Sequence, residues 1–106
     1  GDPPRPVQRC GPDRGGVDVS DRFEELRAEI AANDAEIVRA VNHRLRLVEE
    51  LWRLKAERGD ERLDPDRERR LREALARLNE GPLSEQGLER LVEELLALTK
   101  RELGGT

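Results

Sequence analysis

The sequence predicts an all-α fold with three helices, one long and two short. Residues 22–58 contain no glycine and no proline, whereas these two residue types interrupt the chain on both sides. Apolar residues recur at helical spacing, and no segment alternates apolar and polar residues as a strand would. Aromatic residues make up only 2% of the chain, so any core must consist of Leu, Val and Ile.

The long helix is predicted to have Ser20 or Asp21 as its cap, to span residues 22–58 and to end at Gly59. Its roughly 37 residues correspond to about 55 Å at 1.5 Å per residue. A helix of this length must lie against something equally long.

A tail is predicted before this helix. Residues 1–19 hold four of the six prolines and four of the nine glycines, a composition typical of disorder. The folded domain is therefore expected over residues 20–106.

Two short helices are predicted to follow. Asp64 as N-cap and Pro65 as first helical residue indicate a helix that runs to about Asn79. After a turn at residues 80–82, Ser84 can cap a third helix that runs to about residue 103.

Charged residues interrupt the apolar stripe of the long helix. They are Arg27, Asp34, Arg44 and Lys55. Cations that face a core are costly unless an anion meets them, although long side chains can also reach water from the edge of an apolar face. Because few acids share this stripe, we expect an anionic ligand, and carboxylates suit the fork of an arginine.

The spacing of these cations predicts a homodimer. Arg27 and Lys55 are 28 residues apart, about 42 Å along one helix, so they cannot serve one small ligand from the same chain. If two long helices pair antiparallel near residue 38, Arg27 of one chain lies between Arg44 and Lys55 of the other. A twofold dimer then has two equivalent sites.

Charge and cysteine content argue against several other classes. The net charge of -4, with acids and bases interleaved, is unlike a nucleic-acid-binding surface, and no apolar run is long enough for a membrane span. Cys10 is the only cysteine and His43 the only histidine, so we expect no internal disulfide, metal or cofactor. A cytoplasmic protein without secretory signal fits these features best.

Three segments together resemble the all-helical chorismate mutases. The family's long first helix is similar to LRAEIAANDAEIVRAVNHRLRLVEELWRLKAERG, its second-helix opening to LDPDRERR, and its third helix to GPLSEQGLERLVEELLALTK. The resemblance covers roughly residues 23–103. It implies an intertwined homodimer and an isomerase that rearranges chorismate to prephenate, in phenylalanine and tyrosine biosynthesis, without metal or cofactor.

The resemblance also implies residue roles. Arg44 and Arg27 of the partner subunit would grip the two substrate carboxylates. Lys55 would donate to the ether oxygen as its bond breaks, and Glu68 would accept from the ring hydroxyl. The catalytic set is therefore expected to be Arg44, Lys55 and Glu68.

Further binding roles fall on three other residues. Asp64 would support the ring-hydroxyl end, Arg67 would line the pocket with its side chain turned inward, and Thr99 would lie near a carboxylate, where many members carry serine. Many members also have a glutamine one turn later, a second donor to the ether oxygen, but here that position is Leu103. A small register shift would bring in Glu102, which must be protonated to donate, so activity would then increase at lower pH.

Other interpretations also fit the sequence. A related isochorismate-pyruvate lyase would use much the same charges, and a non-catalytic helical dimer with a regulatory or assembly role would share the fold. A complex with a shikimate-pathway enzyme is a further partner that the resemblance suggests. Trp52 stands where relatives often carry glycine, and we expect it to pack at the interface or seal the pocket.

Overall fold

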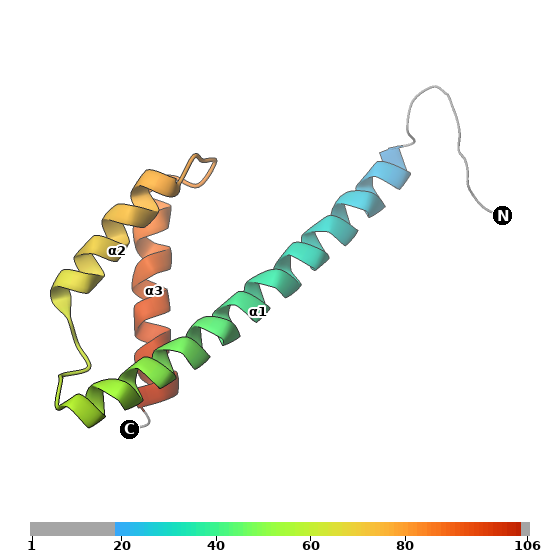
Figure 1. Cartoon of the computed structure of the whole chain (residues 1–106). Coiled ribbons are helices and arrows are strands. Elements are labelled where there is room, and N and C mark those ends of the chain that lie inside the picture. The colour runs from blue at the N-terminus through green and yellow to red at the C-terminus, as the bar shows by residue number, and fades with distance from the viewer. Residues whose placement is uncertain (1–18, 105–106) are drawn as a thin grey trace. The chain divides into compact units, whose positions relative to one another are not determined.

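The computed structural model describes residues 19–104, which form three α-helices (Figure 1). They are α1 (Val19–Arg58), α2 (Pro65–Leu78) and α3 (Glu85–Gly104). No strand occurs within residues 19–104, so the predicted class of one long and two short helices is confirmed. Nor does any helix of this part combine the length and the apolar character needed to cross a membrane.

The predicted tail lies outside the described residues, except for Val19. This residue begins α1, before the cap predicted at Ser20 or Asp21, so both of these residues belong to the helix. Asp21 lies in the first turn, where a carboxylate interacts favourably with the helix dipole.

The chain divides into two units, Gly1–Ala40 and Val41–Thr106, and α1 contributes to both. In the described part of the first unit, every residue except Ala35 is exposed. The large apolar side chains among them are 41–80% exposed, and they are Val19, Phe23, Leu26, Ile30, Ile37 and Val38. This half of α1 therefore presents an apolar stripe that its own unit does not cover.

The second unit contains the C-terminal half of α1 together with α2 and α3. The two short helices pack against each other, side by side in Figure 1. Val92 and Thr99 of α3 are buried, and no other described residue is. In this half of α1 the half-buried positions follow helical spacing, at Val41, Arg44, Leu45, Val48, Trp52 and Lys55. Two cations thus belong to the partly covered face of the helix.

A Schellman motif ends α1 at the predicted glycine. Gly59 adopts φ of 80°, and its N–H donates to the carbonyl oxygen of Ala56 at 3.2 Å. The N–H of Asp60 donates to the carbonyl oxygen of Lys55 at 2.8 Å. This pair of bonds satisfies carbonyl groups that the end of a helix would otherwise leave unpaired.

Side-chain caps begin both short helices as the sequence predicts. Asp64 Oδ1 accepts a hydrogen bond from the backbone N–H of Arg67 at 3.2 Å, with Pro65 at the first helical position. Ser84 Oγ accepts from the N–H of Gly87 at 2.9 Å. These local bonds position the start of each helix.

Substitution of Ser84 by alanine tests the second of these caps. Ser84→Ala removes the acceptor for the Gly87 N–H, and we expect the free energy of unfolding to fall by about 1 kcal/mol. Urea denaturation at a fixed protein concentration measures it. Ser84→Asp retains a capping oxygen and serves as control, so an equal loss in both variants would contradict the assignment.

Candidate active site

Arg44 and Thr99 connect α1 to α3 within the second unit. Arg44 Nη1 donates to Thr99 Oγ1 at 2.6 Å, and the Thr99 hydroxyl donates to the carbonyl oxygen of Leu95 at 2.7 Å. Thr99 is only 5% exposed, so its hydroxyl is fixed as both donor and acceptor. Arg44 is half-buried and has further N–H groups for another acceptor.

Lys55 lies on the same partly covered face of α1. Its Nζ donates to the carbonyl oxygen of Arg62 at 3.0 Å, in the connection between α1 and α2. An ammonium group has three donors, so this bond leaves two for a ligand. Within residues 19–104, neither Arg44 nor Lys55 forms an ion pair with a carboxylate, and each is held by a neutral oxygen instead.

The start of α2 carries three further charged residues of the predicted site. Asp64 and Glu68 are half-buried, whereas Arg67 is exposed in the single chain. The main-chain N–H of Glu68 donates to the carbonyl oxygen of Asp64 at 3.0 Å. Arg67 was expected to turn inward, but no part of its own chain buries it.

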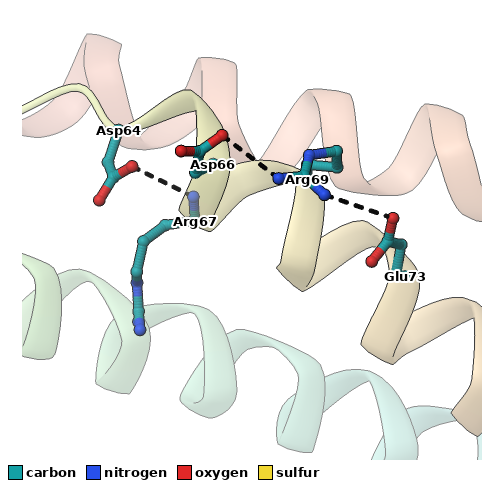
Figure 2. A network of polar contacts seen from close by, with 5 residues as sticks. All are labelled: Asp64, Asp66, Arg67, Arg69 and Glu73. Carbon is teal, nitrogen blue, oxygen red and sulfur yellow. Dashed lines mark hydrogen bonds and ion pairs between the residues drawn. The ribbon is translucent and has the colours of Figure 1, made fainter.

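A separate network of ion pairs occupies another side of α2. Arg69 contacts Asp66 at 3.3 Å and Glu73 at 3.9 Å. Figure 2 shows the Arg67 side chain pointing away from these three residues. The side chains of Asp66, Arg69 and Glu73 are more than half exposed, so their ion pairs contribute little to stability. The guanidinium of Arg67 takes no part in these ion pairs and is available for another partner.

Arg27 belongs to the first unit and is exposed. Its guanidinium carbon lies 4.7 Å from the centroid of the Phe23 ring, one helical turn earlier. An exposed cation–π contact of this kind contributes about 0.5–1 kcal/mol and restricts the arginine side chain.

The end of α3 differs from the pattern that the resemblance suggests. The helix continues unbroken to Gly104, and Leu103 is half-buried one turn after Thr99. Glu102 is exposed. The single chain thus presents an apolar side chain, not an amide, at the position where many family members carry glutamine.

A cavity of about 330 Å³ lies between α2 and α3, away from the predicted residues. Its lining comprises Arg72, Ala76, Asn79, Glu85, Leu88, Glu89 and Val92, so none of the predicted site residues contributes to it. Within residues 19–104, no group of three or more His, Cys, Asp or Glu side chains is arranged to hold a metal ion.

The sequence pattern did not single out Arg62. Its carbonyl oxygen accepts from Lys55, and its guanidinium carbon lies 4.7 Å from the centroid of the Trp52 ring. Any residue except proline has the same backbone groups, so a carbonyl partner leaves no signal in residue type. The stacking contact could have been predicted only from the presence of a tryptophan, Trp52, and an arginine, Arg62, ten residues apart in the sequence.

The contacts of Arg44 and Lys55 indicate which class of ligand the site can bind. Half-buried cationic donors held by neutral oxygens suit a small ligand with carboxylates, or an oxygen that gains negative charge during a reaction.

Comparison with known proteins then identifies the family. Residues 26–102 match the family model described as chorismate mutase type II. The chain also matches a solved structure, that of chorismate mutase (form I) from Thermus thermophilus, with 33% identity and a TM-score of 0.71. The match covers 74% of this chain and 98% of that one. No curated protein matches the chain.

The chain therefore belongs to the chorismate mutase type II family. The resemblance found in the sequence is confirmed, and both matches support chorismate mutase activity, an isomerase reaction.

A double-mutant cycle tests the contact between Arg44 and Thr99. We expect a coupling of about 1 kcal/mol in the free energy of unfolding between Arg44→Ala and Thr99→Val, since either change removes the same hydrogen bond. Denaturation at one protein concentration measures all four proteins. A matched cycle with the exposed Arg46→Ala should show coupling near zero, and equal values in the two cycles would refute the contact.

Proposed function

We propose that the chain catalyses the rearrangement of chorismate to prephenate, with Arg44, Lys55 and Glu68 as its catalytic residues. The observation that carries this proposal is the half-buried Arg44, which is held by the buried Thr99 hydroxyl instead of a carboxylate. This arrangement orients the guanidinium and leaves its charge for an anionic substrate.

The reaction needs no nucleophile. An ether C–O bond breaks while a C–C bond forms within the same molecule, so no group leaves and no proton must be transferred in that step. The protein lowers the barrier by holding the reactive conformer and by stabilising the negative charge that develops on the ether oxygen. Fixed cationic donors are suited to both tasks.

Each residue has a distinct role in this proposal. Arg44 and the partner subunit's Arg27 bind the two carboxylates, and Lys55 donates to the ether oxygen with one of its remaining N–H groups. Glu68 accepts from the ring hydroxyl. The half-buried positions of Arg44, Lys55 and Glu68 support these roles.

Other side chains shape the pocket around these groups. Asp64 supports the ring-hydroxyl end while capping α2, Arg67 lines the pocket, and Thr99 orients Arg44 near a carboxylate. Because Leu103 replaces an amide, we propose that Lys55 is the main donor to the ether oxygen and that Glu102 remains a surface residue. Its exposure supports that assignment.

The homodimer is also part of the proposal. Among the described residues, only Val92 and Thr99 are buried, and a chain that covers so little of itself lacks the core that a stable monomer needs. The exposed stripe that includes Phe23, Ile30 and Ile37 supports pairing with a second copy. An isologous pair of α1 helices would bury the stripe of both subunits.

We propose the cytoplasm as the setting of the reaction. The single cysteine can form no disulfide within the chain, which favours the cytoplasm. A complex with a shikimate-pathway enzyme stays a prediction of the family resemblance.

A direct assay with matched variants tests the activity. Purified protein is mixed with chorismate, and prephenate is identified as the product. We expect Arg44→Ala and Lys55→Ala each to lower kcat/KM by about a hundredfold or more, because each removes a donor to substrate charge. The exposed Arg46→Ala and Lys100→Ala are controls and should retain activity.

Two outcomes would favour the other functions. Turnover of isochorismate but not of chorismate would establish the lyase. No turnover of either, with a dimer that Arg44→Ala leaves intact or stabilises, would indicate a regulatory or assembly role, since a buried cation weakens a purely structural interface.

Mixed dimers test whether Arg27 acts across the interface. Arg27→Ala and Arg44→Ala should each be inactive alone. When the two are unfolded and refolded together, about half of the dimers are mixed, and each mixed dimer has one site of two with both arginines. We therefore expect recovery of about a quarter of the wild-type activity.

Two observations would contradict this arrangement. Lack of recovery in a sample that contains mixed dimers would place both arginines of a site in the same chain. A monomeric wild-type protein by sedimentation would exclude the proposed dimer.

A further inference from the structure

The connection between α1 and α2 makes two contacts with one face of α1. The guanidinium carbon of Arg62 lies 4.7 Å from the centroid of the Trp52 ring, and the carbonyl oxygen of the same residue accepts from Lys55 Nζ at 3.0 Å. Trp52 and Lys55 are three residues apart, so they are neighbours on the helix surface, and both are half-buried. Arg62 therefore contacts two side chains that lie next to each other.

We propose that Trp52 and Arg62 are positioning residues for Lys55. The stacking contact holds the connection in place, and the Arg62 carbonyl then restrains the Lys55 ammonium group. The inference rests on the proposed function in one respect, since it takes Lys55 as the group that meets the substrate.

The contact between Arg62 and Trp52 restrains the part of the connection that has few other contacts. The connection is fixed at its beginning by the Asp60 N–H bond to the Lys55 carbonyl, and at its end by the Asp64 cap. Between these points Arg62 is exposed and Leu63 is 57% exposed. Neither apolar burial nor a helix bond therefore holds the Arg62 carbonyl, and the Trp52 ring supplies that restraint.

A backbone carbonyl suits this task better than a carboxylate. A lysine side chain has many rotamers, and ordering it before the substrate arrives lowers the cost of reaching the reactive geometry. A carboxylate partner would neutralise the ammonium group, whereas a neutral carbonyl orients it and preserves the charge. One N–H group is used in this way, and two remain for the substrate.

Lysine reactivity tests the restraint without any substrate. The sequence contains two lysines, Lys55 and the exposed Lys100, so an acylating reagent gives an internal ratio of labelling. Limited treatment with acetic anhydride, followed by mass spectrometry of the peptides, measures this ratio. In Arg62→Ala we expect labelling of Lys55 relative to Lys100 to increase about two- to fivefold, the range expected from losing an exposed cation–π contact.

Matched variants separate the stack from general loosening. Trp52→Leu should change the ratio in the same direction, and Arg62→Lys should change it less because a cation over the ring is retained. Arg53→Ala removes an exposed arginine beside Trp52 and should leave the ratio unchanged. An unchanged ratio in folded Arg62→Ala would overturn the proposal, whether or not Trp52→Leu folds.

Kinetics then test whether the restraint serves the reaction. We expect Arg62→Ala to lower kcat about three- to tenfold with little change in KM, because the chemical step depends on how Lys55 is placed. In a Lys55→Ala background, Arg62→Ala should cause no further loss, since it acts through Lys55. An equal loss in both backgrounds would overturn the positioning role.

Failure of this inference and failure of the proposed function lead to different results. If the wild-type protein turned over no chorismate, the proposed function would fail, and the positioning of Lys55 would still be decided by the labelling ratio. If the wild type were active and Lys55→Ala inactive, an unchanged ratio in Arg62→Ala would overturn the inference alone.

Discussion

The apolar stripe of α1 is the constraint on which the rest of the molecule depends. Its N-terminal half has no buried residue, and its large apolar side chains remain exposed. Hydrophobic burial is the main favourable term in folding, so a helix with such a stripe needs a second surface. In the proposed homodimer the same requirement would link stability to function, because a second copy that covers the stripe would also bring a second Arg27.

Neutral oxygens hold two cations of the proposed site. Arg44 donates to a threonine hydroxyl and Lys55 to a backbone carbonyl, whereas Arg69, on another side of α2, pairs with two carboxylates. Both arrangements orient a charged side chain, but only a neutral acceptor leaves the charge uncompensated. In the proposed active site, the positive charge retained in this way would meet the two carboxylates of the substrate, at a cost in stability that a structural interface would not require.

An intramolecular rearrangement makes few chemical demands on a protein. It requires shape, and charge at the position where the ether oxygen becomes negative, so the precision of a few donors matters more than their reactivity. In the proposed site, the helix ends would supply part of that precision. The Schellman motif at Gly59 and the Asp64 cap fix both ends of the connection that carries the Arg62 carbonyl. In the proposed site, Leu103 stands where the family resemblance suggests an amide donor, which would increase the importance of Lys55.

The sequence by itself determined the helices, their boundaries and the family. Gly59, Asp64 with Pro65, and Ser84 act through bonds within a few residues, so local pattern predicts them well. Only α1 begins earlier than expected, at Val19. The residues of the site and their roles were predicted through the family resemblance, but their contacts were not.

Tertiary structure alone decided how these residues are held. The bond from Arg44 to Thr99 spans 55 positions in the chain, and the contacts of Arg62 depend on the path of a short connection. Side-chain rotamers and a backbone carbonyl leave no pattern in residue type. Helical periodicity predicted Lys55 within the apolar stripe of α1, but only the folded chain determined which oxygen meets its ammonium group.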